Sequence, residues 1–234
     1  MTDETRDFSA MGYFVARRAV SEVECSALEA ALDPVLTEQS SSGAIASAHG
    51  IRNLLSLSPS IRSFASQGLL LELASSALGL TARPVKAIYF DKLPEANWGV
   101  PWHQDLTIAV RRRADVPGFG TWTTKAGVLH VQPPASVLES VVTLRVHLDD
   151  CPAANGALRV VPGNHQYGRL DAVQSVALRK QQGEAVCEAR KGDVLVMSPL
   201  ILHSSPRAEV ATHRRIIHIE YSSQPLPDPL QWHN

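Results

Sequence analysis

Apolar residues in the first third of the chain recur at helical spacing. Ser21 and Glu24 have the spacing of a capping box, and the residues after them place an apolar set on one helical face: Leu28, Leu32, Val35 and Leu36. A short strand is expected just before this helix, at residues 13–15. A second helical region follows Ser58-Pro59 and ends near Gly79. We therefore predict a helical N-terminal third.

From about residue 84 the pattern changes to short β-branched segments separated by Pro, Gly, Asn and Asp. These segments are PVKAIYF, SVVTLRVHL, ALRVV, GDVLVM and RRIIHIEYSS. Short strands with such turns are typical of a sandwich or barrel. The pattern predicts a mostly β protein with flanking helices. Residues 108–139 read as a long irregular connection, and connections of that length are usually functional lids or mobile segments.

Two of the expected strands have a polar face. Thr143, Arg145 and His147 alternate with an apolar set, Val142, Leu144, Val146 and Leu148. In the last strand Arg214 shares a face with Ile216, His218 and Glu220, while Arg215 lies on the opposite face. Polar faces of this kind either line a ligand cavity or meet solvent. Thr143 and Arg145 are therefore candidate cavity residues, with a half-exposed strand as the alternative.

Composition limits the class of partner. The chain has 234 residues, of which 44% are hydrophobic and 19% charged, which suits one domain over residues 1–234 with a sizeable core. A formal net charge of -1 provides no basic surface for nucleic acid or an anionic membrane. The acidic N-terminus and the lack of a long apolar run predict a cytoplasmic protein. We expect a small-molecule partner.

The three cysteines carry no motif. Cys25, Cys151 and Cys187 are odd in number and have no C-x-x-C spacing. Reduced, partly buried thiols are the simplest interpretation.

The stretch GVPWHQDLTI contains a candidate metal site. His103 and Asp105 would project to the same face of a strand, and Gln104 would point away. His203, at the end of GDVLVMSPLILH, could join them from a neighbouring antiparallel strand. Two imidazoles and one carboxylate form the facial triad of non-haem iron(II) oxygenases. A structural His-Asp pair would produce the same local sequence.

Arg214 follows His203 by eleven residues, which allows one strand to end, turn and return beside itself. A guanidinium donates two parallel hydrogen bonds to a carboxylate, so Arg214 could hold the far end of a dicarboxylate co-substrate. A zinc hydrolase could use the same three ligands. That alternative leaves Arg214 without a purpose and offers no obvious general-base Glu beside the ligands. A non-catalytic binding module on the same scaffold is a further alternative, although all three ligands are present.

These segments together resemble the phytanoyl-CoA dioxygenase family of iron(II)- and 2-oxoglutarate-dependent oxygenases. The resemblance runs through GYFVARR, FDKLPEANWGVPWHQD, LDDCPAANGALRVVPGNH, GDVLVMSPLILHSS and RRIIHIEYSS. The most specific of these contains NGALRVVPGNH, which looks like the family's Asn-Gly-x-Leu-x-x-x-Pro-Gly-x-His stretch. The resemblance implies a double-stranded β-helix, that is, a cupin-like jelly roll.

The resemblance also implies roles for individual residues. His103, Asp105 and His203 match the iron ligands, and Arg214 matches the arginine that holds the distal carboxylate of 2-oxoglutarate. The further co-substrate contacts that we expect are Arg145, Ser205, Arg52 and Thr143. His130 and Trp122 are expected to be either substrate contacts or ordinary packing residues.

The implied cofactors are Fe(II), 2-oxoglutarate and O2, and the implied products of the co-substrate are succinate and CO2. The protein contributes positioning and exclusion of water, while the metal supplies the difficult chemistry. Related halogenases lack the carboxylate ligand, so Asp105 favours hydroxylation of an unactivated carbon. Function resides in sites rather than in folds, so the resemblance indicates the reaction type and not the substrate.

Overall fold

The computed structural model describes residues 8–41, 50–92, 97–210 and 212–234. Part of the segment FDKLPEANWGVPWHQD, residues 93–96, lies outside the described residues, as does the acidic N-terminus at 1–7. The helices are α2 (Glu22–Ser41), α3 (Leu54–Leu57), α4 (Pro59–Ala65), α5 (Gly68–Leu78), α6 (Ala135–Glu139) and α7 (Ala172–Gln182). Two 3-10 turns are η3 (Ala153–Asn155) and η4 (Asn164–Tyr167).

The predicted helical N-terminal region is present. The backbone N–H of Ser21 donates to Glu24 Oε2 at 2.8 Å, and the Glu24 N–H donates to Ser21 Oγ at 3.3 Å, so the capping box starts α2. The second region divides into α4 and α5 at Gln67, whose backbone is extended, and α5 then begins at Gly68 with a positive φ of 62°. It ends at Gly79 in the left-handed conformation that commonly closes a helix.

The expected strands also form. The structure contains β1 (Tyr13–Ala16), β2 (Arg83–Lys92), β3 (Val100–His103), β4 (Ile108–Val110), β5 (Gly120–Lys125), β6 (Val128–Gln132), β7 (Val141–His147), β8 (Leu158–Val160), β9 (Ala185–Cys187), β10 (Val194–Met197), β11 (His203–Ser205) and β12 (Arg214–Ser222). All their pairings are antiparallel. The fold combines several antiparallel sheets with four helices before residue 79, α2 to α5, and with α6 and α7 later in the described chain.

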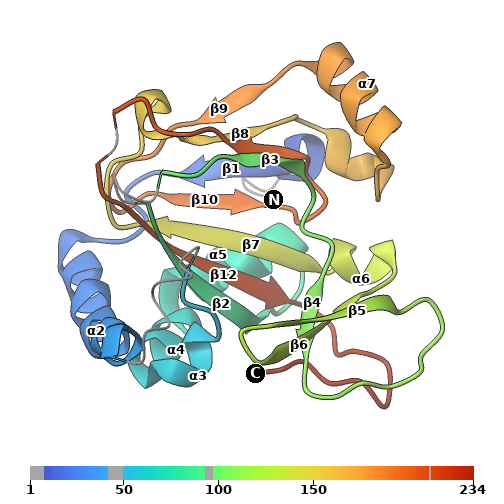
Figure 1. Cartoon of the computed structure of the whole chain (residues 1–234), viewed down its shortest axis with the longest axis horizontal. Coiled ribbons are helices and arrows are strands. Elements are labelled where there is room, and N and C mark those ends of the chain that lie inside the picture. The colour runs from blue at the N-terminus through green and yellow to red at the C-terminus, as the bar shows by residue number, and fades with distance from the viewer. Residues whose placement is uncertain (1–7, 42–49, 93–96, 211) are drawn as a thin grey trace.

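A five-stranded sheet forms the centre, in the order β1-β10-β7-β12-β2. Its outward residues, such as Leu144, Val196 and Ile217, pack with the buried residues of α2 to α5 in one core cluster. Figure 1 shows α2, α3 and α4 at the lower left, beside β2 and β12. The helices cover one face of the sheet, so the polar residues on its other face turn toward the interior.

A four-stranded sheet, in the order β3-β11-β8-β9, lies opposite that interior face and is at the top of Figure 1. A second apolar cluster joins its Leu158 and Val160 to Leu195 and Met197 of β10. The strand β7 is therefore buried on both faces, and the half-exposed alternative is wrong.

Cys25, Cys151 and Cys187 are free and buried, as expected.

The expectation of an irregular connection over residues 108–139 is wrong. This segment forms a three-stranded antiparallel sheet, in the order β4-β6-β5, followed by α6 (Figure 1). Its strands are short, and GTWTTK carries little apolar alternation. The local sequence pattern that would predict these strands is weak, because the sheet is stabilised by packing with distant residues, including Leu226, Leu230 and Trp232. No described helix is long and apolar enough to cross a membrane.

Candidate metal centre

The candidate ligands come together at the pairing of β3 with β11. His203 lies opposite His103 in this antiparallel pair. Asp105 Oδ1 is 3.7 Å from His103 Nε2, and Asp105 Oδ2 is 3.7 Å from His203 Nε2. One ligand atom from each residue lies within 4.8 Å of the others. This spacing allows one metal ion to contact all three.

The predicted strand geometry at these ligands is wrong in one respect. Strand β3 ends at His103, so Asp105 does not share a strand with it. The Asp105 N–H instead donates to Pro199 O at 2.9 Å, which holds the chain beside the segment leading to β11. Gln104 does turn elsewhere, because its amide donates to the carbonyls of Gly168 and Leu200. Tertiary contacts therefore bring the carboxylate to the imidazoles.

Hydrogen bonds fix the orientation of both imidazoles. His103 Nδ1 lies 2.8 Å from Pro101 O, and His203 Nδ1 lies 2.9 Å from Ile201 O. A carbonyl only accepts, so each Nδ1 donates its hydrogen to that carbonyl and each ring turns its Nε2 toward the metal position. Burial lowers the pKa of His203 to about 4, which keeps this ring neutral at physiological pH.

The electrostatics of Asp105 also suit a ligand. Burial opposes its ionisation, but His203, His218 and His103 outweigh burial and lower the pKa of the carboxyl. The side chain keeps 30% of its surface exposed, and that surface lines the cavity. The carboxylate is therefore charged and accessible from the cavity.

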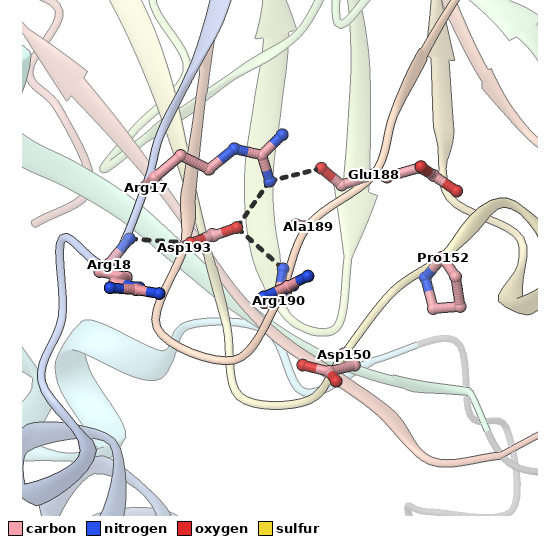
Figure 2. A pocket seen from close by; sticks show the side chains of 8 residues that line it. All are labelled: Arg17, Arg18, Asp150, Pro152, Glu188, Ala189, Arg190 and Asp193. Carbon is pink, nitrogen blue, oxygen red and sulfur yellow. Dashed lines mark hydrogen bonds and ion pairs between the residues drawn. The ribbon is translucent and has the colours of Figure 1, made fainter.

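The ligands open into an interior cavity of about 590 Å³, a size typical of small-molecule sites. A larger hollow of about 720 Å³ lies on the outer surface around Arg17, Arg190 and Asp193. Figure 2 shows that Asp193 accepts hydrogen bonds there from Arg17, at 2.7 Å, and from the backbone of Arg18 and Arg190. The Asp193 carboxylate is thus paired within the protein, and none of the three ligands lies there. We therefore place the site in the interior cavity.

One end of this cavity is built to hold an anion. Ser205 Oγ accepts a hydrogen bond from Lys92 Nζ at 3.1 Å and one from Arg214 Nη1 at 3.2 Å. Ser205 donates to Gly156 O at 3.1 Å, and Arg214 Nη1 also donates to that carbonyl. Lys92, Ser205 and Arg214 are all buried. Two buried cations therefore share one hydroxyl, and no described carboxylate lies within ion-pair distance of either.

The residues fit iron(II) and a dicarboxylate. The Nε atoms of Arg214 and Arg145 are buried without a hydrogen-bond partner among the described residues. Unpaired buried donors are costly, and a carboxylate would satisfy them. The donor set of two neutral imidazoles and one carboxylate is the set that suits non-haem iron(II). The cavity therefore provides a metal position and, separately, an anchor for a carboxylate.

Comparisons with known proteins agree with this geometry. The family model described as "Phytanoyl-CoA dioxygenase (PhyH)" matches residues 8–216. The chain belongs to the phytanoyl-CoA dioxygenase family. This family consists of iron(II)- and 2-oxoglutarate-dependent oxygenases, so the protein is an enzyme of that class, with His103, Asp105 and His203 as its candidate triad. Membership favours the oxygenase over the zinc hydrolase and the non-catalytic binding module.

Solved structures of the same fold include AviO1 from Streptomyces viridochromogenes Tue57, which is 21% identical with a TM-score of 0.67 and 96% of both chains covered. The carbocyclase SnoK from nogalamycin biosynthesis is 18% identical with a TM-score of 0.71, over 95% of this chain and 84% of that one. EctD from S. alaskensis, solved with 2-oxoglutarate and 5-hydroxyectoine, is 17% identical with a TM-score of 0.71, over 95% and 76%. At these identities the likeness shows the fold. No curated protein shows significant similarity to the chain.

The residues predicted as further 2-oxoglutarate contacts do not all lie in the same part of the protein. Arg145 lines the cavity and donates to His218 Nδ1 at 3.0 Å. Ser205 lies beside Arg214, as described. Arg52 lines the cavity near Lys86 and Ile88, away from Arg214. Thr143 is fully buried with an unpartnered hydroxyl, but it is not among the residues that line the cavity.

The two candidate substrate contacts do not line the cavity. His130 is buried beside a small adjoining void, and its Nδ1 lies 3.0 Å from Val128 O. Trp122 packs under Arg113, whose guanidinium carbon is 5.5 Å from the ring centre. Both side chains are packing residues of the three-stranded sheet.

Sequence reasoning missed the cationic residues of β2 and β5. Lys86, Ile88, Phe90 and Lys92 alternate along β2 and all line the cavity. This alternation is visible in PVKAIYFDK and could have identified Lys86 and Lys92 as cavity residues, in the same way that alternation identified Arg145. Lys125 at the end of β5 gave no comparable signal, because its position depends on the missed three-stranded sheet.

Proposed function

We propose that this enzyme hydroxylates an unactivated carbon of a small molecule and converts 2-oxoglutarate and O2 to succinate and CO2. The observation that carries the proposal is the placement of a complete two-His-one-Asp set and a buried carboxylate anchor, Arg214 with Ser205, in one cavity. When bound, iron supplies the oxidation chemistry. The chain supplies the positions of the reactants.

The residues have separate tasks in this proposal. His103, Asp105 and His203 hold the metal, with the Nδ1 hydrogen bonds keeping both rings oriented. Arg214, Ser205 and Lys92 bind the distal carboxylate of the co-substrate, and Arg145 lines the space toward the metal. The buried sheet faces exclude water from the co-substrate. A role for Thr143 in co-substrate binding stays a prediction, and Arg52, also predicted as a co-substrate contact, lies with Lys86 and Ile88, away from Arg214.

Hydroxylation is favoured because the carboxylate ligand Asp105 is present. A halide-transferring relative would need that coordination position open. The solved structures of the same fold include a non-haem, α-ketoglutarate-dependent carbocyclase and an epimerase, so proteins of this fold also carry out other reactions. Substrate placement, rather than the ligand set, distinguishes these outcomes.

We further infer that residues 1–234 form one catalytic domain built on a double-stranded β-helix. The five-stranded and four-stranded antiparallel sheets, with the cavity lined from both, support this inference. The expected cytoplasmic location stays a prediction.

The test is an anaerobic titration of metal-free protein with iron(II) and then 2-oxoglutarate. Chelation of iron by the keto acid should produce a weak visible charge-transfer band in the wild type and none in Asp105→Ala. Circular dichroism should show the variant to be folded. No band in the wild type, together with tight binding of zinc, would contradict the proposal and favour the hydrolase.

A further inference from the structure

The charge lining the cavity is unbalanced. Its described residues carry two carboxylates, Asp105 and Glu220, against six cationic side chains, Arg52, Lys86, Lys92, Lys125, Arg145 and Arg214. With all six protonated, these leave an excess of four positive charges, and the excess is still three where Lys92 is neutral. Iron(II) adds two positive charges and 2-oxoglutarate two negative ones, so binding both leaves the excess unchanged. Lys92 and Arg214 are buried, while Arg52, Lys86 and Lys125 are partly buried. Unpaired charge away from bulk water is costly, and a further anion would reduce the cost.

Five of the six cations, all except Arg145, form two groups at different points along the cavity. Lys92 pairs with Arg214 across β2 and β12, whereas Lys86 pairs with Glu220. Lys86 precedes Lys92 by six residues of one strand, about 20 Å along it. The distal carboxylate of 2-oxoglutarate occupies the Arg214 end in the proposed function. The group at the Lys86 end, which we call the Lys125 cluster, consists of Lys125, Lys86 and Arg52.

The Lys125 cluster has too few carboxylates. Glu220 is bound to Lys86 at 2.5 Å and lies 3.4 Å from His218 Nε2. Lys125 Nζ contacts only a neutral group, Thr107 Oγ1 at 3.3 Å, among the described residues. The guanidinium of Arg52 makes no hydrogen bond or ion pair within the described part of the chain. Burial, Lys86 and Arg52 lower the pKa of the Lys125 amine, and the opposing effects of Asp105 and Glu220 do not cancel this lowering.

We infer that the primary substrate carries a carboxylate or phosphate group, which binds to Lys125 and Arg52 while 2-oxoglutarate occupies the Arg214 end. Both oxyanions accept charge-assisted hydrogen bonds from an ammonium and a guanidinium. The inference rests on the proposed function, because it assigns the substrate to the end of the cavity that the co-substrate leaves open. It also gives the three-stranded sheet a role, since β5 carries Lys125 into the cavity.

The test uses the anaerobic iron(II) protein with saturating 2-oxoglutarate and three probes of equal chain length: hexanoate, hexyl phosphate and the neutral hexanamide. Calorimetry should detect at least one of the two acids binding about 10-fold more tightly than the amide. The tighter of the two acids identifies the head group. Equal affinity for the acids and the amide would overturn the inference.

Three variants locate the binding. Lys125→Gln should weaken acid binding by about 10-fold, and Lys125→Arg should restore most of it. Arg113→Gln, which removes an exposed cation outside the cavity, should leave it unchanged. Equal effects of Lys125→Gln and Arg113→Gln would overturn the inference. The inference would also be overturned if 2-oxoglutarate abolished acid binding, because the acid would then occupy the Arg214 end.

Failure of the proposed function can be recognised separately. It would appear as the absence of the charge-transfer band before any probe is added. The comparison of Lys125→Gln with wild type in iron(II) protein lacking 2-oxoglutarate would still test whether the Lys125 cluster binds the acids.

Discussion

Lys92 and Arg214 face each other across β2 and β12, and both donate a hydrogen bond to the hydroxyl of Ser205. Two cations that share one hydrogen-bond acceptor repel each other, and both are buried. Burial, followed by the charge of Arg214, lowers the pKa of Lys92 to about 7. Such an arrangement is unfavourable until an anion binds between or beside the two groups, which explains its suitability for a carboxylate.

The first prediction concerns the two cations of this anchor. Arg214→Ala should weaken 2-oxoglutarate binding by about 10- to 100-fold, since hydrogen bonds to charged groups contribute about 1.5–3 kcal/mol. Lys92→Met should weaken it by about 10-fold. Titration of the charge-transfer band measures both. The control is Arg215→Ala, whose side chain binds Asp149 outside the cavity and should leave the affinity unchanged. Unchanged affinity in Arg214→Ala would show that the anchor is wrongly assigned.

The second prediction is a pH dependence. Lys92 is charged below its pKa of about 7 and neutral above it, so the anchor loses one positive charge as pH rises. The affinity for 2-oxoglutarate should therefore fall between about pH 6.5 and about pH 8.5, with proton uptake on binding in the upper part of that range. Lys92→Gln should remove most of this dependence. Identical pH profiles for the variant and the wild type would assign the titration to another group.

The third prediction concerns Gly156 in the NGALRVVPGNH motif. Its φ is +70°, and an added Cβ would lie 2.7 Å from Pro206 O. Its carbonyl accepts from Ser205 and Arg214. Gly156→Ala should therefore destabilise the fold by about 1–3 kcal/mol and weaken 2-oxoglutarate binding. Urea unfolding and band titration measure the two effects.

Gly127→Ala is the matched control for that glycine. Gly127 has a similar φ of +76°, but an added Cβ there meets nothing within 4 Å. This variant should show only the backbone cost, about 1 kcal/mol, with normal co-substrate affinity. If both variants bind 2-oxoglutarate normally, the close approach at Gly156 does not position the anchor.

The fourth prediction concerns the buried pair Lys86–Glu220. The side chains are 13% and 5% exposed. Glu220→Gln leaves Lys86 without its partner and should cost about 3 kcal/mol in the free energy of unfolding. The double variant Lys86→Met/Glu220→Gln should recover much of the loss. Glu184→Gln, which removes the ion pairs with the exposed side chains of Arg159 and Arg179, should cost less than about 1 kcal/mol. Equal losses at the two sites, measured by urea unfolding, would contradict the buried-pair argument.

Local sequence patterns were enough to predict the frame of the protein. The capping box at Ser21, the β-branched segments from residue 84 and the alternation that separates Arg214 from Arg215 all correspond to elements of the structure. The ligand residues were also identifiable, because His103, Asp105 and His203 stand in segments that resemble the family. Each of these features depends on residues near one another in the chain or on a strand's period of two.

Other features depend on contacts that the sequence does not display. The three-stranded sheet over 108–139 was missed because its strands gain stability from Leu226, Leu230 and Trp232, about a hundred residues away. Asp105 reaches the metal position through a bond to Pro199 rather than through the strand of His103. Thr143 has the right alternation for the cavity, but it does not line it.

The sequence by itself therefore determined the helical and β regions, the ligand types and the family. Only the tertiary structure decided which charges share a cavity. Lys92 joins Arg214, and Lys125 joins Arg52, because strands and loops distant in sequence pack around one cavity. The alternation of residues along a strand indicates which face of that strand a side chain occupies. The partner across the cavity follows from the packing of the whole chain.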